Sequence, residues 1–205
     1  IGDYVSSAWE DTDHTLWLGT IAGISRYNPS RMFYRIIRLA EKYPELDQNW
    51  HITCMAQNPL NGEWWLGSRN GKIYVYDPIN NQSRYIDLIA MAKGQESPTF
   101  IVDIEFHKGL AIICAINQPT LQYNIKTNKL QRFYGLTGKY KDYKARVFSL
   151  ETDSTYILGN NFDQVLRWNF KQNTIQEITF HCPLDPDGLT YSAGWLNSFK
   201  DKGTW

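Results

Sequence analysis

A tripeptide that recurs at nearly constant spacing constrains the fold of this chain more than any other feature. Trp-Leu-Gly at residues 17–19 returns at residues 65–67. The corresponding positions are then Ile-Ile-Cys at 112–114, Ile-Leu-Gly at 157–159 and Trp205, in steps of 48, 47, 45 and 48 residues. A repeat of about 40 to 50 residues, made of short apolar runs and turn residues, is typical of a β-propeller blade.

The repeat predicts an all-β fold made of four-stranded antiparallel blades. We expect four blades and the start of a fifth, at residues 4–49, 50–98, 99–144, 145–194 and 195–205. Because four and a fraction blades do not close a ring, we interpret the chain as part of a larger propeller, expected to have seven blades.

Within a blade, the residue types indicate which strand packs where. The first strand mixes small and apolar residues, a turn rich in Asp, Asn or Gly follows, and the second strand carries the repeated tripeptide. We expect its tryptophan to pack between neighbouring blades and its glycine to admit another backbone or a large ring. This structural motif comprises Trp17, Gly19, Trp65, Gly67, Gly159 and Trp205.

The connections between blades are long, at residues 38–50, 87–99, 135–144 and 182–194. Connections beyond about 12 residues are uncommon in compact domains and are usually functional or mobile. Residues 87–93 could form one or two helical turns.

Composition excludes several classes of protein. Twenty-one basic and 21 acidic residues cancel, and a chain this balanced lacks the basic face that nucleic acid requires. Its longest apolar run, residues 110–116, is far too short to span a bilayer. Cys54 and Cys114 occupy positions that hold Ser7 or glycine in other repeats, so we expect small core residues and no disulfide framework.

The first repeat resembles a specific family. Residues 7–29 show an acidic turn, then Trp-Leu-Gly-Thr, then Gly-Ile and a closing Tyr-Asn-Pro. This pattern is similar to the two-component-regulator propeller repeat. The second repeat keeps Trp-Leu-Gly-Ser, Gly71 and Tyr-Asp-Pro, whereas the third and fourth keep position and hydrophobicity more than identity.

The resemblance implies a biological setting. In that family such repeats form the extracytoplasmic sensor of bacterial hybrid two-component systems, which often recognise oligosaccharides released from complex glycans. The implied parent is a histidine kinase with receiver and DNA-binding modules, anchored in the inner membrane outside this chain and dimeric through its ectodomain. The implied location of this segment is the periplasm.

No pattern of catalytic or metal-binding residues stands out, and we expect no cofactor. Asp11, Asp13 and Thr15 faintly suggest a calcium loop but lack its glycine and distal glutamate, so a hairpin turn is the better interpretation. His181 and Cys182 are adjacent, which is poor geometry for one metal ion. The chain also lacks a nucleophile elbow and a phosphate-binding glycine loop.

One rim of the propeller is the most promising place for a ligand. The loops that enter each first strand and those between second and third strands should lie on the same face. Aromatic rings with amides and a few charges suit polyhydroxylated ligands, although turn-forming asparagines would give a similar composition. The candidate residues are Trp50, His51, Arg69, Asn70, Asn117, Gln118, Arg146, Asn160, Asn161, Asp163 and Trp195.

The sequence therefore favours a non-catalytic, oligosaccharide-sensing propeller segment of a sensor kinase. The alternatives are a scaffold for protein–protein interaction and a propeller lyase or hydrolase, because a fold alone does not set a function.

Overall fold

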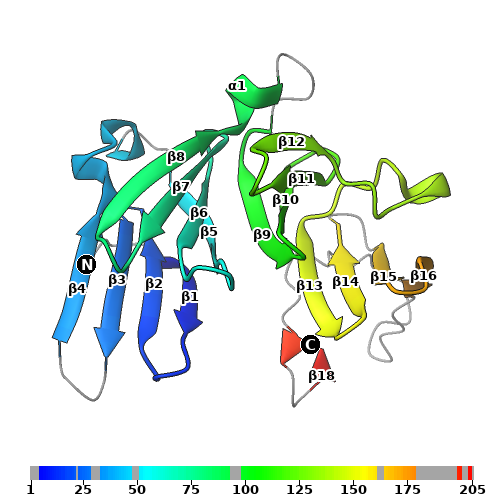
Figure 1. Cartoon of the computed structure of the whole chain (residues 1–205), viewed down its shortest axis with the longest axis horizontal. Helices are drawn as coiled ribbons and strands as arrows, with labels where there is room; N and C mark the ends of the chain where they lie inside the picture. Colours follow the sequence, from blue (N-terminus) through cyan, green and yellow to red (C-terminus); the bar gives the residue numbers. More distant parts are fainter. Residues whose placement is uncertain are drawn as a thin grey trace, which may run out of the picture. The chain divides into compact units, whose positions relative to one another are not determined.

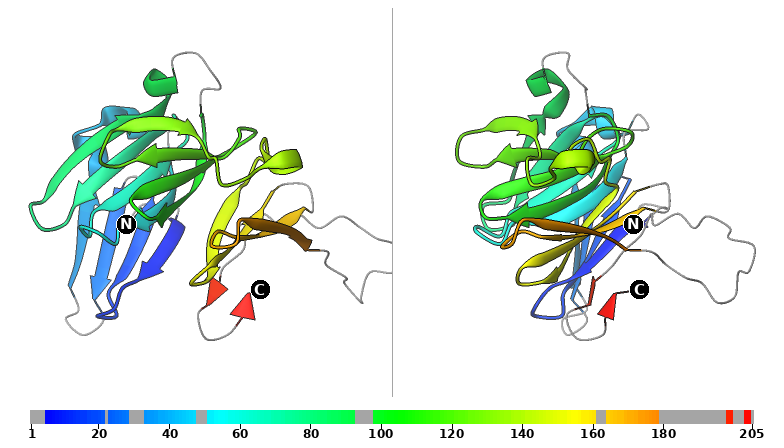
Figure 2. Two further views of the ribbon diagram at one scale, coloured as in Figure 1. Left: turned by 45° about the vertical axis from the view of Figure 1, so that its right-hand side comes forward. Right: turned by 90° about the vertical axis from the view of Figure 1, so that its right-hand side faces the viewer.

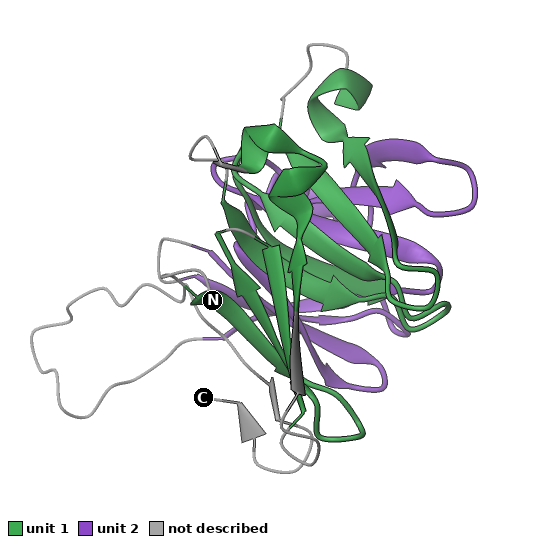
Figure 3. Cartoon of the chain, turned by 90° about the vertical axis from the view of Figure 1, so that its left-hand side faces the viewer, with its two compact units in different colours: residues 1–106 green, residues 107–205 purple. Residues whose placement is uncertain are grey.

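We describe a computed structural model of residues 5–21, 23–28, 33–47, 51–92, 98–160, 164–178, 198–199 and 203–204. The chain divides into two compact units, Ile1–Phe106 and His107–Trp205, coloured separately in Figure 3. Each unit is described by itself.

The first unit contains two four-stranded antiparallel sheets, ordered β1-β2-β3-β4 and β5-β6-β7-β8 (Figures 1 and 2). The strands of the first sheet are β1 (Val5–Glu10), β2 (Leu16–Thr20), β3 (Gly23–Asn28) and β4 (Phe33–Arg38). Those of the second are β5 (Ile52–Gln57), β6 (Trp64–Ser68), β7 (Lys72–Asp77) and β8 (Gln82–Asp87). Each sheet pairs strands that are consecutive in sequence, as expected for a propeller blade.

Two further four-stranded sheets follow the same order of pairing, β12-β11-β10-β9 and β13-β14-β15-β16. Their strands are β9 (Ile101–His107), β10 (Leu110–Ala115), β11 (Leu121–Asn124), β12 (Lys129–Arg132), β13 (Val147–Thr152), β14 (Thr155–Gly159), β15 (Val165–Asn169) and β16 (Thr174–Ile178). A short hairpin of β17 (Ser198–Phe199) and β18 (Gly203–Thr204) lies near the carboxyl end. The all-β architecture of repeated antiparallel blades predicted from the sequence is confirmed.

The helices are short: η1 (Leu39–Glu41), η2 (Pro44–Asp47), α1 (Leu88–Ala92) and η3 (Gly138–Tyr140). Helix α1 lies where one or two helical turns are predicted. None of the helices in the described part of the chain is long and apolar enough to cross a membrane.

The tryptophans of the repeated tripeptide lie at contacts between successive blades of the first unit. Trp17 is 5% exposed, and its ring centroid lies 4.9 Å from that of Trp64. Trp65 is fully buried and meets Phe106 of β9 edge-on at 5.3 Å. Large rings that pack in this way exclude water between blades.

Asp11 ties the acidic turn to this packing. Its Oδ1 atom accepts hydrogen bonds from the backbone N–H groups of Asp13 and Thr15 at 3.2 and 2.9 Å. Its Oδ2 atom accepts a 2.7 Å bond from the Trp17 indole. Asp11 therefore organises a hairpin turn and holds the ring that packs on the next blade.

The glycine of the tripeptide admits side chains, not the backbone or large ring that we predicted. A Cβ atom built on Gly67 would lie 2.5 Å from Cys54 Sγ, directly across the strand pair, and 2.7 Å from Ile101 Cγ2. In the first blade Ser7 stands opposite Gly19 and would meet a Cβ atom in the same way. The prediction was wrong because the facing first strand supplies a small side chain that fills the space.

Hydroxyl groups link each of the first two blades to its successor. Ser6 Oγ donates to the carbonyl oxygen of Ile52, in β5, at 2.8 Å. One repeat later, Thr53 Oγ1 donates to the carbonyl oxygen of Ile101, in β9. The third repeat has Val102 after Ile101, which carries no hydroxyl.

The long connection after β4 is part of the core. Leu39, Tyr43 and Leu46, which lie in and between η1 and η2, are 3%, 7% and 1% exposed. They pack in one cluster with Trp17 and Tyr74. Packing on this cluster accounts for the described part of the connection, residues 39–47, without a ligand.

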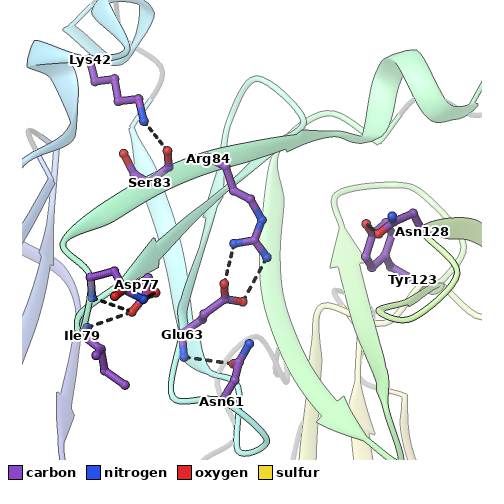
Figure 4. A network of polar contacts seen from close by, with 10 residues as sticks. Lys42, Asn61, Glu63, Asp77, Ile79, Ser83, Arg84, Tyr123 and Asn128 are labelled. Carbon is purple, nitrogen blue, oxygen red and sulfur yellow. Dashed lines mark hydrogen bonds and ion pairs between the residues drawn. The ribbon is translucent and has the colours of Figure 1, made fainter.

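The hairpins between third and fourth strands share one pattern of hydrogen bonds within the turn (Figure 4). Asp77 Oδ1 accepts the N–H groups of Ile79 and Asn80 at 2.8 and 3.2 Å. Asn81 closes the turn at φ 55°, and Tyr76 donates to its side-chain oxygen at 3.1 Å. The other two such hairpins in the described chain begin at Asn124 and Asn169 and close on Asn128 and Asn173, both at φ 52°.

One cysteine is buried in the second blade and another in the third, and an ion pair lies on the second blade. Cys54 and Cys114 are buried and form no disulfide within the described part of the chain. Burial, with the Asp103 charge, raises the pKa of Cys54 well above its usual range. At the outer face, Arg84 makes two hydrogen bonds to Glu63, at 2.6 and 3.0 Å (Figure 4). This fork fixes the outer strand β8 over the turn that precedes β6.

Candidate ligand-binding rim

In the first unit, the loop between β6 and β7 lies beside the entries of two successive first strands. The Arg69 N–H donates to the carbonyl oxygen of His51, just before β5, at 3.2 Å. The Arg69 carbonyl accepts from the Phe100 N–H, just before β9, at 3.2 Å. The two kinds of loop that we expected to share one face therefore meet here, joined by backbone hydrogen bonds.

The second unit repeats this arrangement with different contacts. The Arg146 N–H, just before β13, donates to the Gly159 carbonyl oxygen at 2.7 Å. Tyr143, in the preceding connection, donates its hydroxyl to the Gln164 carbonyl oxygen at 2.6 Å. The loop between β14 and β15 is thus held against the entry of its own first strand.

Several candidate amides stabilise the loops that carry them. Asn70 accepts from the Lys72 N–H at 3.2 Å and donates to Tyr74 Oη at 3.1 Å. Asn160 is 8% exposed and accepts from the Gln164 N–H at 3.2 Å. Asn117 lies at φ 59°, the left-handed region that asparagine tolerates in turns. These three residues have the turn-forming role that was the alternative interpretation.

His51 and Arg69 remain as polar side chains of the rim in the first unit. Arg69 is exposed, and its guanidinium carbon lies 4.8 Å from the centroid of the Phe100 ring. The Nδ1 atom of His51 is buried and has no hydrogen-bond partner in the part of the chain that the structure describes. Phe100, which we did not predict as a site residue, has φ 56°, an unusual value for a bulky residue.

The remaining candidates are distributed as follows. Gln118 and Arg146 are partly buried. Trp50, Asn161, Asp163 and Trp195 lie outside the described residues, as does Trp205 of the structural motif.

A carboxyl group with a shifted pKa lies on β9 and was not a candidate. Burial and the charge of Asp103, two residues before it, raise the pKa of Glu105 to about 8. Residues two apart on a strand share a face. The signal available in the sequence was a pair of acidic residues inside an otherwise apolar strand.

His107 lies among rings of the second unit. Its Nδ1 atom is 2.9 Å from Tyr156 Oη, and its ring centroid is 4.6 Å from that of Phe170. Burial, with the charge of Lys108, lowers the pKa of His107. The described residues contain no group of three His, Cys, Asp or Glu side chains arranged to bind a metal ion.

The fold and the rim define a segment of a β-propeller, and solved structures share this fold. The extracellular domain of a protein described as the hybrid two-component system BT4673 from B. thetaiotaomicron matches 96% of the chain, with TM-score 0.66 and 16% identity. The corresponding domain of BT3049 from the same organism matches 87% of the chain, with TM-score 0.61 and 11% identity. The mitotic checkpoint complex contains a chain that matches 88% of this one, with TM-score 0.61 and 11% identity.

The chain spans about a quarter of each of the two extracellular domains, 24% and 25%, and 52% of the checkpoint chain. No family model matches the sequence, and no curated protein matches it either. At these identities the likeness establishes the fold, and the two-component domains agree with the family that the repeat resembles.

Proposed function

We propose that this chain is a non-catalytic, ligand-sensing segment of the periplasmic part of a membrane-bound hybrid two-component sensor. The ligand would be a glycan-derived oligosaccharide, and the output would be transcription controlled through kinase, receiver and DNA-binding modules of the parent. One observation carries the proposal: the chain shares its fold with the extracellular domains of two hybrid two-component systems, and its sequence repeat independently resembles the two-component-regulator propeller repeat.

The rim supports a sensing mechanism in physical terms. Arg69 is bonded through its backbone to the entries of two successive first strands, at His51 and Phe100. A ligand at this point would contact groups held by two blades at once. A ligand shifts an equilibrium only by binding its two states differently, so signalling would follow if binding changed how two receptor ectodomains of a dimer are placed.

A scaffold for other proteins is the second candidate. It is favoured by the match to a chain of the mitotic checkpoint complex, an assembly of proteins. Exposed apolar side chains at hairpin tips, such as Leu60 and Ile79 at 71% and 82% exposure, would suit such contacts.

Isothermal titration of the intact protein that carries this chain, with a panel of neutral and acidic oligosaccharides, tests the proposal. We expect saturable binding of at least one glycan without its degradation. Absence of binding across the panel, together with a stable protein partner, would favour the scaffold. Turnover of a glycan would instead make the protein an enzyme.

A further inference from the structure

The Arg69 guanidinium has no counterion among the described residues. Arg69 is exposed, and none of the described residues makes a hydrogen bond or ion pair to its guanidinium group. Two other arginines differ, since Arg84 makes two hydrogen bonds to Glu63 and Arg167 makes two to Glu151. The five N–H donors of Arg69 are therefore available to an external acceptor.

Phe100 holds this cation in one place. Its ring lies under the guanidinium at 4.8 Å, and its N–H donates to the carbonyl oxygen of Arg69 itself. Backbone and side chain of Arg69 thus both contact Phe100. A non-glycine residue at φ 56° persists only where its surroundings impose it, and such strain is concentrated at binding sites.

His51 adds a second polar group to the same backbone ladder. Its carbonyl oxygen accepts from Arg69, and its Nδ1 atom is buried without a partner among the described residues. A buried polar atom that is left unpaired in a folded protein calls for an explanation.

Arg69 also departs from the repeat. The residue two positions after the tripeptide glycine is Ile21 in the first repeat and Arg69 in the second. The first repeat thus fills this loop position with an apolar side chain. Arginine there is not required by the fold of a blade.

We propose that Arg69, supported by Phe100 and flanked by His51, binds the oxyanion of an acidic saccharide. The inference rests on the proposed sensing function and specifies its ligand class. A carboxylate or a sulfate offers paired oxygens that match the guanidinium fork, while Phe100 screens one side of the contact from water. Neutral sugars would lack this contact.

The test uses the intact protein and three oligosaccharides of equal length: an oligogalacturonate, a sulfated glycan and a neutral glucan. Binding is measured by titration calorimetry for the wild type and for Arg69→Gln, Arg69→Lys and Phe100→Leu. Lys126→Gln, which removes one positive charge from an exposed hairpin turn between β11 and β12, is the matched control. Circular dichroism and melting temperature verify that each variant is folded.

We expect Arg69→Gln to weaken binding of an acidic glycan by about tenfold or more, since a hydrogen bond to a charged group contributes about that factor. Arg69→Lys keeps the charge but loses the planar fork, so its loss should be intermediate, and Lys126→Gln should bind as the wild type does. The weakening should shrink at high salt. An effect confined to the oligogalacturonate identifies a carboxylate, and one confined to the sulfated glycan identifies a sulfate.

Two results would overturn this inference while leaving the sensing function intact. One is binding of the neutral glucan alone, and the other is binding of an acidic glycan with equal affinity by wild type and folded Arg69→Gln. Failure of all three glycans and of a wider panel would refute both proposals.

Discussion

Replacing Gly67 with alanine tests how tightly the second strand of a blade is packed. Gly67 pairs with Cys54 on one side and Ile73 on the other. The added methyl carbon would lie 2.5 Å from Cys54 Sγ and 2.7 Å from Ile101 Cγ2, well inside van der Waals contact. Alanine should otherwise favour this strand, because glycine in a strand interior is destabilising by about 0.5–1 kcal/mol relative to alanine.

Whether Gly67→Ala raises or lowers the free energy of unfolding therefore depends on which of these two effects is larger. Inserting a methyl group into a packed core costs about 1–3 kcal/mol, because both neighbours must shift. Because the methyl carbon would meet two neighbours below 3 Å, the insertion cost should lie in the upper half of that range, which leaves a net loss of about 1–2 kcal/mol. For a chain of this size each kcal/mol lowers the melting temperature by roughly 2–4 °C, so a decrease of about 2–8 °C is expected. Thermal melts and urea titration of the intact protein measure it.

A double-mutant cycle identifies the clash. Cys54→Ala removes the Sγ atom that the new methyl group meets, while Ile101 stays in place. Gly67→Ala should therefore cost less in the Cys54→Ala background, with a coupling of about 0.5 kcal/mol or more. The reasoning fails if Gly67→Ala is as stable as the wild type, or if the two changes are simply additive.

Three further changes test other contacts. Thr53→Val keeps the shape of the side chain but deletes the hydroxyl that bonds to Ile101, so the free energy of unfolding measured in urea should fall by about 1 kcal/mol. An unchanged urea midpoint would mean that this link between blades does not stabilise the fold. Tyr76→Phe removes the hydrogen bond to Asn81 and should also lower the free energy of unfolding by about 1 kcal/mol. Tyr134→Phe, at an exposed tyrosine, is the matched control. Burial raises the pKa of Glu105 to about 8, so the folded chain keeps a proton that the unfolded chain loses near pH 4.5. The contribution of Glu105 to the free energy of unfolding therefore falls as pH rises from about 4.5 to 8. Glu105→Gln should flatten that slope, and an equal slope in both proteins would contradict the assignment.

The sequence predicts the blades well because each repeat contains the same local signals. Hairpin turns depend on residues a few positions apart, and Asp11 fills this role through bonds to its own loop. The reason for the glycine was harder to see. It depends on the residue that stands across the strand pair, Ser7 or Cys54, and on Ile101 from the following blade. Those contacts depend on register, which the repeat alone does not specify.

The candidate site was less predictable because composition does not show which partners a side chain binds. Asn70 and Asn160 have the composition of a binding loop, yet their side chains bond to their own turns. Phe100 was missed because it precedes its strand by one residue and reads as apolar packing. A signal was present: Tyr4, His51 and Phe100 place a ring just before the first strand of three repeats.

Repetition also separates residues that build the fold from residues that can bind. The first two blades each have a small residue opposite their glycine and a ring that packs on the next blade, as Cys54 and Trp65 show. Neither requirement explains a cation at Arg69, where the first repeat has isoleucine. The Arg69 guanidinium lies on the ring of Phe100, a residue with strained backbone. Blade packing does not require this charge, because isoleucine fills the same position in the first repeat. Recognition in this chain should therefore be sought where one repeat differs from the others.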